Sequence, residues 1–280
     1  MKQGFGWLHN LVTLVLVAPV LACAQVRVAV LPVSEQASAQ LVSILDELQE
    51  ITPVRKPRNA DILLLTSRAV LPTACAQNKP IVLLDPGIPA ESWPGKCHIT
   101  RIIISASLSR QVEVLTLLLP GAARVGVLYS EESAPLLPGL REQLEQHKLL
   151  LVARQAQRPE HLSAALAELM TDADLLLALP DMTIFNAGNA RQLLMTAYRK
   201  GKPIIGPDDH WVRAGSLASA YISSDALSST LGTVLLTLSR GEHISSPILL
   251  PDSVLVNIHV AKAFDIAIPP ELANSEGEGQ

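Results

Sequence analysis

Three short sequence patterns occur twice in the chain, in the same order. One apolar match could arise by chance, but three ordered matches indicate two structural units of one design. We therefore predict a duplicated protein with two lobes. The repeated patterns are Arg27-Val28-Ala29-Val30-Leu31 with Arg124-Val125-Gly126-Val127-Leu128, Ala60-Asp61-Ile62-Leu63-Leu64-Leu65 with Ala173-Asp174-Leu175-Leu176-Leu177, and Lys79-Pro80-Ile81-Val82 with Lys202-Pro203-Ile204-Ile205.

Short apolar runs alternate with longer amphipathic segments along the chain. The runs are almost continuously apolar, which is typical of parallel strands covered by helices on both faces. The fold class is therefore α/β, with two Rossmann-like lobes built on mostly parallel sheets. Strands are predicted at residues 26–32, 60–66, 80–85, 99–105, 124–130, 149–155, 174–180 and 203–208, and helices at 35–50, 136–147, 159–170 and 189–200.

The two halves differ in length. The spacing from Arg27 to Asp61 is shorter than that from Arg124 to Asp174, and the spacing from Asp61 to the first repeated Lys-Pro is shorter than its counterpart. We expect the first lobe to lack a helix and to have shorter loops.

The N-terminus has the features of an export signal. Lys2 precedes an apolar run at residues 11–21 that ends in small residues and is too short to span a membrane. Residues 1–24 are therefore predicted to be a signal peptide, and the mature protein to be periplasmic. Ala22-Cys23-Ala24 fits ordinary cleavage, whereas Val20-Leu21-Ala22-Cys23 resembles a lipobox, so lipidation of Cys23 is the alternative.

Two cysteines remain once the export signal is set aside. In an oxidising compartment, Cys75 and Cys97 are expected to form a disulfide. The alternative is a pair of separate buried thiols. A metal site is not expected, because no third or fourth ligand stands at the usual spacing.

Composition and motifs exclude several classes of function. A net charge of −4 and 3% aromatic residues argue against a nucleic-acid-binding protein. The chain also lacks a Gly-x-Ser-x-Gly elbow, a His-Glu-x-x-His helix, a Walker loop and a Gly-x-Gly-x-x-Gly turn. We predict no enzymatic activity and no cofactor.

Polar residues follow several predicted strands, where open parallel sheets bind their ligands. A cleft between the carboxyl ends of the two sheets is therefore the predicted binding site. Its candidate residues are Ser34, Thr66, Ser67, Arg68 and Asp85 in the first lobe, and Tyr129, Ser130, Asp181, Asp208 and Asp209 in the second.

Each charged candidate also has a simpler interpretation. Arg68 could bind a ligand carboxylate or be a solvated helix residue. Asp181 could bind a ligand ammonium or hydroxyl group, or cap a short turn. Asp208, with Asp209 and His210 after it, could hold a cation or an amine, although a polar loop before the next helix is the better interpretation.

Few aromatic side chains are available to contact a ligand. Trp211 and Tyr221 flank a turn of the second lobe, where they could contact an apolar ligand or lie at the lobe surface. Phe185 could cover the mouth of the cleft or pack in the core. Trp93 is expected to pack the loop closed by the disulfide.

The second half resembles bacterial ABC-transporter substrate-binding proteins of the tryptophan- and tyrosine-binding type. The likeness covers most of residues 120–272, while the first half matches more thinly through residues 66–69 and Asp85-Pro86. The residues that carry it are 124–129, Leu177-Ala178-Leu179-Pro180-Asp181, Lys202-Pro203-Ile204-Ile205-Gly206, Val212-Arg213-Ala214-Gly215-Ser216-Leu217, Val256-Asn257, Ala261-Lys262-Ala263 and Ile268-Pro269-Pro270.

This resemblance implies a type I periplasmic binding fold that closes on a small ligand. It places residues 25–104 and 224–250 in the first lobe and 105–223 and 251–272 in the second. Residues 273–280 are expected to form a disordered tail. The chain would cross near Ser105, Ser224 and Pro251, and residues 232–240 and 260–265 would be helices.

Two functions follow from the resemblance. The first is a solute-binding protein of an ABC importer, a monomer that binds a small molecule, such as an amino acid, and presents it to an inner-membrane permease. The second is a sensing or interaction module of the same fold without a transport role, which the shortened first lobe suggests.

Overall fold

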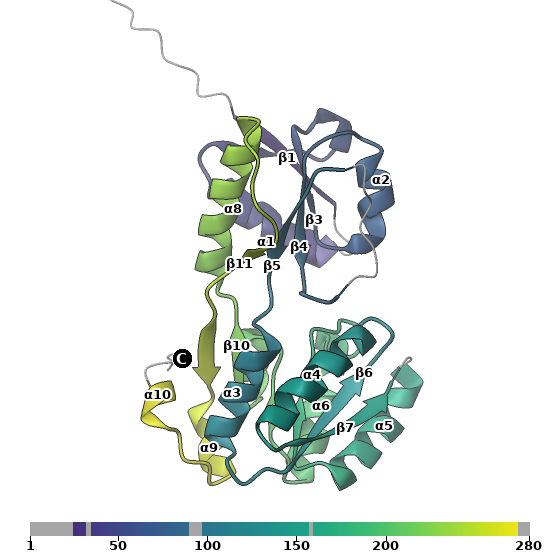
Figure 1. The fold of residues 1–280 in the computed structure, drawn as a ribbon, viewed down its shortest axis with the longest axis vertical. Coiled ribbons are helices and arrows are strands. Elements are labelled where there is room, and N and C mark those ends of the chain that lie inside the picture. Colours follow the sequence, from purple (N-terminus) through teal and green to yellow (C-terminus); the bar gives the residue numbers. More distant parts are fainter. Residues whose placement is uncertain (1–24, 32–34, 90–96, 157–158, 274–280) are drawn as a thin grey trace, which may run out of the picture.

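Two mostly parallel sheets form the centres of two lobes (Figure 1). The computed structural model describes residues 25–31, 35–89, 97–156 and 159–273. The predicted signal peptide with Cys23, and also Ser34, Trp93 and the tail beyond Ala273, lie outside these ranges. The α/β fold class with two lobes is confirmed.

The first lobe is built on a six-stranded sheet in the order β11-β5-β4-β3-β1-β2, with all neighbours parallel. Its strands are β1 (Val26–Leu31), β2 (Ile51–Pro53), β3 (Ile62–Leu65), β4 (Ile81–Asp85), β5 (Ile99–Ile103) and β11 (Ile248–Leu249). Its helices are α1 (Glu35–Asp46), η1 (Pro57–Asn59), η2 (Arg68–Val70), α2 (Leu71–Cys75) and α8 (Ser224–Ser239).

The second lobe repeats this strand order as β12-β10-β9-β8-β6-β7, with β12 antiparallel to β10. Its strands are β6 (Arg124–Tyr129), β7 (Leu150–Gln155), β8 (Leu175–Leu177), β9 (Ile204–Ile205), β10 (Ala218–Tyr221) and β12 (Ser253–Val256). Its helices are α3 (Leu108–Leu118), η3 (Ala134–Leu136), α4 (Leu137–Gln146), α5 (Pro159–Asp172), α6 (Ala187–Arg199), α7 (Asp209–Ala214), α9 (Ile258–Ala263) and α10 (Pro270–Ala273).

The repeated sequence patterns occupy equivalent strands of the two sheets. They form β1 and β6, β3 and β8, and β4 and β9, which hold the same places in the two strand orders. The second lobe carries α5 between β7 and β8, whereas the first has only η1 between β2 and β3. The expected loss of a helix from the first lobe is therefore confirmed.

The chain passes between the sheets from β5 to α3, from β10 to α8 and from β11 to β12. Helix α8 packs with α1 on one face of the first sheet, through residues such as Leu45 and Leu231. It begins eight residues before the predicted start at Gly232, because Ser223 caps its first turn by accepting a hydrogen bond from the Ala226 N–H.

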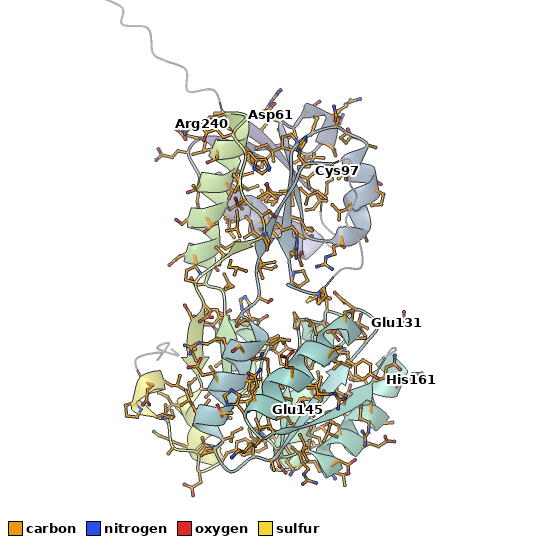
Figure 2. The ribbon with its side chains drawn as sticks, viewed as in Figure 1. Asp61, Cys97, Glu131, Glu145, His161 and Arg240 are labelled. Atoms are coloured by element: carbon orange, nitrogen blue, oxygen red, sulfur yellow. A yellow bond between two sulfur atoms is a disulfide. The ribbon has the colours of Figure 1, made fainter. Side chains whose placement is uncertain are left out.

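The repeated charged residues form the same ion pair in each lobe. Arg27 Nη2 lies 2.6 Å from Asp61 Oδ1, and Arg124 Nη2 lies 3.1 Å from Asp174 Oδ1. Each carboxylate also accepts the backbone N–H of its arginine, at 2.9 Å in both lobes. Asp61 lies at the end of the first lobe that points away from the second (Figure 2). The repeated arginine and aspartate residues therefore hold neighbouring strands together, at the ends of the sheets away from the predicted cleft.

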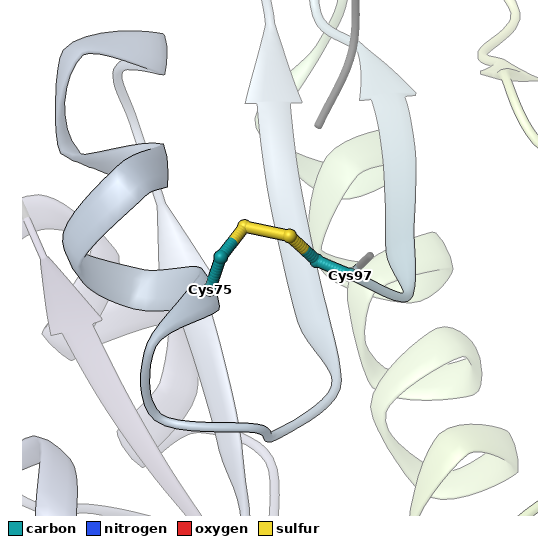
Figure 3. The surroundings of a disulfide bond; sticks show 2 residues. All are labelled: Cys75 and Cys97. Carbon is teal, nitrogen blue, oxygen red and sulfur yellow. A yellow bond between two sulfur atoms is a disulfide. The ribbon is translucent and has the colours of Figure 1, made fainter. Parts of the chain in front are cut away.

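The disulfide joins Cys75 at the end of α2 to Cys97 before β5, with 5.5 Å between their Cα atoms (Figure 3). Both cysteines pack against a small apolar cluster with Leu71 and Ala74. On this face of the first sheet the only α-helix among the described residues is the short α2. The covalent link therefore reinforces a thinly covered face.

We predict that removing this disulfide destabilises the first lobe. The bond closes a loop with a sequence separation of 22 residues, which corresponds to about 3 kcal/mol of unfolding free energy in the chain-entropy model. Urea unfolding of the Cys75→Ser, Cys97→Ser double variant beside the parent would measure the loss. An unchanged unfolding midpoint would contradict the prediction.

We predict that Asp174→Asn destabilises the second lobe in a pH-dependent way. Burial acts to raise the pKa of Asp174, but the N–H groups of Ala123 and Arg124 and the Arg124 guanidinium lower it overall. The lowered pKa favours the folded state above the unfolded carboxyl pKa, and this contribution disappears as pH falls through the folded pKa. The loss should be about 1 kcal/mol at neutral pH and smaller in acid, as measured by thermal unfolding at several pH values. A loss equal at every pH would argue against the ion pair.

Candidate functional site

A cavity of about 1180 Å³ lies between the lobes, at the carboxyl ends of both sheets. Its walls are formed by α1, the first turn of α8 and the loops that follow β3, β4 and β5 in the first lobe, and by the segments that follow β6, β8 and β9 in the second. The lining residues are Leu41, Ser43, Ile44, Thr66, Ser67, Arg68, Leu84, Pro86, Ile88, Pro89, Ile104, Ser224 and Leu227 from the first lobe and its connections, and Glu132, Pro135, Met182, Thr183 and His210 from the second.

A cationic group forms part of the first-lobe wall. Thr66, Ser67 and Arg68 follow β3 directly, and all three line the cavity as half-buried residues. The Ser67 hydroxyl accepts the Ala69 N–H at 3.2 Å and so caps η2. This cap starts the turn on which Arg68 stands.

Asp85 lies beneath Arg68 at the end of β4 and is fully buried. Its Oδ1 accepts a hydrogen bond from Arg68 Nη2 at 2.7 Å, and its Oδ2 accepts one from Arg101 Nε at 2.7 Å. Two guanidinium groups therefore share one carboxylate, and this bond holds the Arg68 side chain at the cavity wall. The arrangement makes Asp85 a support for Arg68, rather than a lining residue.

An acidic group faces the cavity from the second lobe. Glu132 lines the cavity, and the partial burial of its carboxylate, followed by the nearby charge of Asp181, raises its pKa. The backbone N–H groups of Met182 and Thr183 act in the opposite direction. Glu132 therefore carries a carboxylate whose charge is incompletely compensated by the protein.

Asp181 is buried beside this wall and is saturated with hydrogen bonds. Its Oδ2 accepts the Ser130 N–H at 2.9 Å and the Ser133 hydroxyl at 2.6 Å, and its Oδ1 accepts the N–H groups of Thr183 and Ile184. It thus has the capping role that the sequence left open, and it joins the turn after β6 to the turn after β8.

The remaining second-lobe candidates lie away from the cavity lining. Asp208 caps α7 by accepting the Trp211 N–H at 3.0 Å, and its partial burial raises its pKa. Asp209 pairs with Arg213 at 3.1 Å. Phe185 and Trp211 are buried and pack edge to face, with their ring centroids 5.6 Å apart.

Tyr129 and Tyr221 are half-buried at the ends of β6 and β10, and neither lines the cavity. The structure brings His210 of the Asp208, Asp209 and His210 group to the cavity, together with Glu132 and Met182, which lie within two positions of a sequence candidate. Met182 is 70% exposed, although it is a large apolar side chain. Its position directly after Asp181 was the available signal for this residue.

Within the described part of the chain, no helix is both long enough and apolar enough to cross a membrane. The described residues also contain no group of three histidine, cysteine, aspartate or glutamate side chains placed to hold a metal ion.

We predict that Glu132→Gln stabilises the ligand-free protein slightly. The raised pKa means that the folded state disfavours the charged carboxylate, a cost that is present above the folded pKa and absent below the unfolded pKa. Since the group faces solvent, the gain should stay well below about 1 kcal/mol. Melting curves should separate the variant from the parent at neutral pH and converge in acid, whereas a lower melting temperature of the variant at neutral pH would refute this reasoning.

Comparisons with solved structures show the same two-lobed fold. A domain from Streptococcus pneumonia in complex with L-Trp superposes with a TM-score of 0.72 at 15% identity, over 90% of this chain and 99% of that one. A conserved domain protein from Vibrio cholerae gives 0.71 at 20% identity, over 90% and 98%. A ligand-free, open substrate-binding protein with adhesive properties from Clostridium difficile gives 0.67 at 17% identity, over 92% and 100%.

A search of curated proteins finds no match. The family model described as ABC transporter substrate binding protein, in contrast, matches residues 73–278, most of the chain. The match includes the cavity-lining turns after β4, β6, β8 and β9. The chain therefore belongs to the ABC transporter substrate-binding protein family.

Proposed function

We propose that the protein is the extracytoplasmic receptor of an ABC importer. It would bind a small solute between its lobes as a monomer, without catalysis, and present the closed complex to an inner-membrane permease. Family membership and the cavity between the lobes support this role. A solute that contacts both walls stabilises the closed arrangement, because it favours the state in which both sets of contacts exist.

The ligand that best fits the cavity is an amino acid. Arg68 provides positive charge from the first lobe, and Glu132 provides negative charge from the second. A free amino acid carries a carboxylate and an ammonium group that match these two charges. This pairing of opposite charges across the cavity is the single observation that carries the proposal.

The rest of the lining suits an apolar side chain. Ile88 and Pro89 from the first lobe and Pro135 and Met182 from the second supply apolar surface near the two charged groups. L-Trp, the ligand in the Streptococcus structure, is an amino acid with an apolar side chain. The fold also accommodates sugars, since a binding protein from Actinobacillus succinogenes has bound D-allose, so the preference rests on the charges of this cavity.

A sensing or interaction module without transport is the second candidate. The thin first lobe motivates it, and the Clostridium difficile protein shows that adhesive properties can accompany this fold. Genes for a permease and an ATPase beside this gene would favour import. A neighbouring membrane sensor would favour the alternative.

We predict that an apolar or aromatic amino acid raises the melting temperature of the protein. A ligand at about 100 times its dissociation constant adds about 2.7 kcal/mol of stability, which amounts to several degrees for a protein of this size. A thermal-shift screen of the L-amino acids, with purines, sugars and small organic acids beside them, would identify the class. Stabilisation by sugars alone would overturn the proposal.

Variants at the two charged groups would test where the amino acid binds. Arg68→Met and Glu132→Gln should each weaken the binding of the amino acid found in that screen by roughly tenfold to a hundredfold, as measured by calorimetry. Arg213→Met is the matched control, because Arg213 is an exposed arginine that pairs with Asp209 outside the cavity. If all three variants bound the amino acid with equal affinity, the assignment of its binding site to Arg68 and Glu132 would be wrong.

A further inference from the structure

Ile88 belongs to the first lobe by its place in the chain, yet its side chain is buried by the second. It lies between β4 and β5, is 6% exposed, and packs in the apolar cluster formed by α3, α4 and the second sheet. Figure 1 shows the chain leaving β4 on the side of the first lobe that faces the second. Ile88 is therefore an apolar contact between the lobes, placed at the cavity wall.

The turn that carries Ile88, residues 86–89, is fastened to the first lobe at several points. Gly87 has a φ of +76°, and a Cβ there would lie 3.1 Å from the Ser105 hydroxyl, so this tight turn favours glycine. The Gly87 N–H donates to Asp85 Oδ1 at 2.9 Å, and the Ser105 hydroxyl donates to the Pro86 carbonyl at 2.8 Å. These contacts direct Ile88 outward from its own lobe.

Arg68 connects this turn to the cavity. Its guanidinium donates hydrogen bonds to the carbonyl oxygens of Ile88 and Pro89, in addition to its bond with Asp85. The same side chain lines the cavity. The group that faces the ligand space therefore also holds the backbone of the residue that contacts the opposite lobe.

We propose that Ile88 is an interlobe latch controlled by Arg68. Docking of Ile88 in the second-lobe cluster keeps the lobes together before any solute binds, because the contact buries apolar surface only in the docked state. A solute that binds Arg68 changes the hydrogen bonds that this side chain donates to the Ile88 and Pro89 carbonyls. It thereby changes how firmly Ile88 is held in the second-lobe cluster. The occupancy of the cavity and the relative position of the lobes are thereby linked through one side chain.

Small-angle X-ray scattering of the ligand-free protein tests the latch. Ile88→Ala should increase the radius of gyration, with the ratio of docked to undocked molecules falling roughly tenfold or more. Ile102→Ala is the matched control, because Ile102 is fully buried within the first-lobe cluster. It should lower the melting temperature and leave the scattering of the folded protein unchanged. Scattering of Ile88→Ala identical to that of the parent would overturn the proposal.

A second variant tests the link to Arg68. Arg68→Met should open the ligand-free protein in the same direction as Ile88→Ala, and the double variant should open it no further, because both changes release one contact. Additive opening, or no opening in Arg68→Met, would overturn control of the latch by Arg68. Since these measurements need no solute, their failure is distinguishable from a failure of the proposed amino-acid specificity.

Discussion

The buried carboxylate of Asp85 is the interaction on which the first-lobe wall of the cavity depends. A carboxylate without exposure to water needs partners, because removing one member of a buried ion pair leaves an uncompensated charge. Arg68, Arg101 and the Gly87 N–H supply those partners. The same contacts fix the direction of Arg68 and the course of the turn at residues 86–89, so the charge and the apolar surface of this wall have a common support.

The second lobe uses Asp181 in a similar way. This buried acid joins the turns after β6 and β8 through four hydrogen bonds, and the residues beside those anchoring points, Glu132 and Met182, reach the cavity. Each lobe thus has a buried acid that organises a wall without lining it. At the opposite ends of the sheets, the pairs of Arg27 with Asp61 and Arg124 with Asp174 hold neighbouring strands together. The ion pair is the same in both lobes, whereas the residues that line the cavity differ between them.

The sequence-based prediction succeeded where the signal was local. Every predicted strand is present, although β8 and β9 have only three and two residues. Six of the eight predicted strands belong to the repeated patterns, which mark them in both lobes. The prediction missed β2, β10, β11 and β12, which have two to four residues each and lie outside the repeated patterns. Within the cavity, Thr66, Ser67 and Arg68 were anticipated, but Glu132 and Met182 were overlooked in favour of Ser130 and Asp181. After β6 and β8, the side chains of Ser130 and Asp181 accept backbone N–H groups of the following turn, and the exposed Glu132 and Met182 come after them.

The sequence by itself determined the α/β class, the duplication of the lobes, the shorter first lobe and the edge of each sheet where a ligand space would form. These properties follow from apolar patterning and from the direction of parallel strands, and both are encoded locally. The tertiary structure alone decided that Arg68 shares Asp85 with Arg101, that Glu132 faces the cavity, and that Ile88 is buried by the opposite lobe. Each of these arrangements brings together residues from different elements, and it depends on packing that no local pattern specifies.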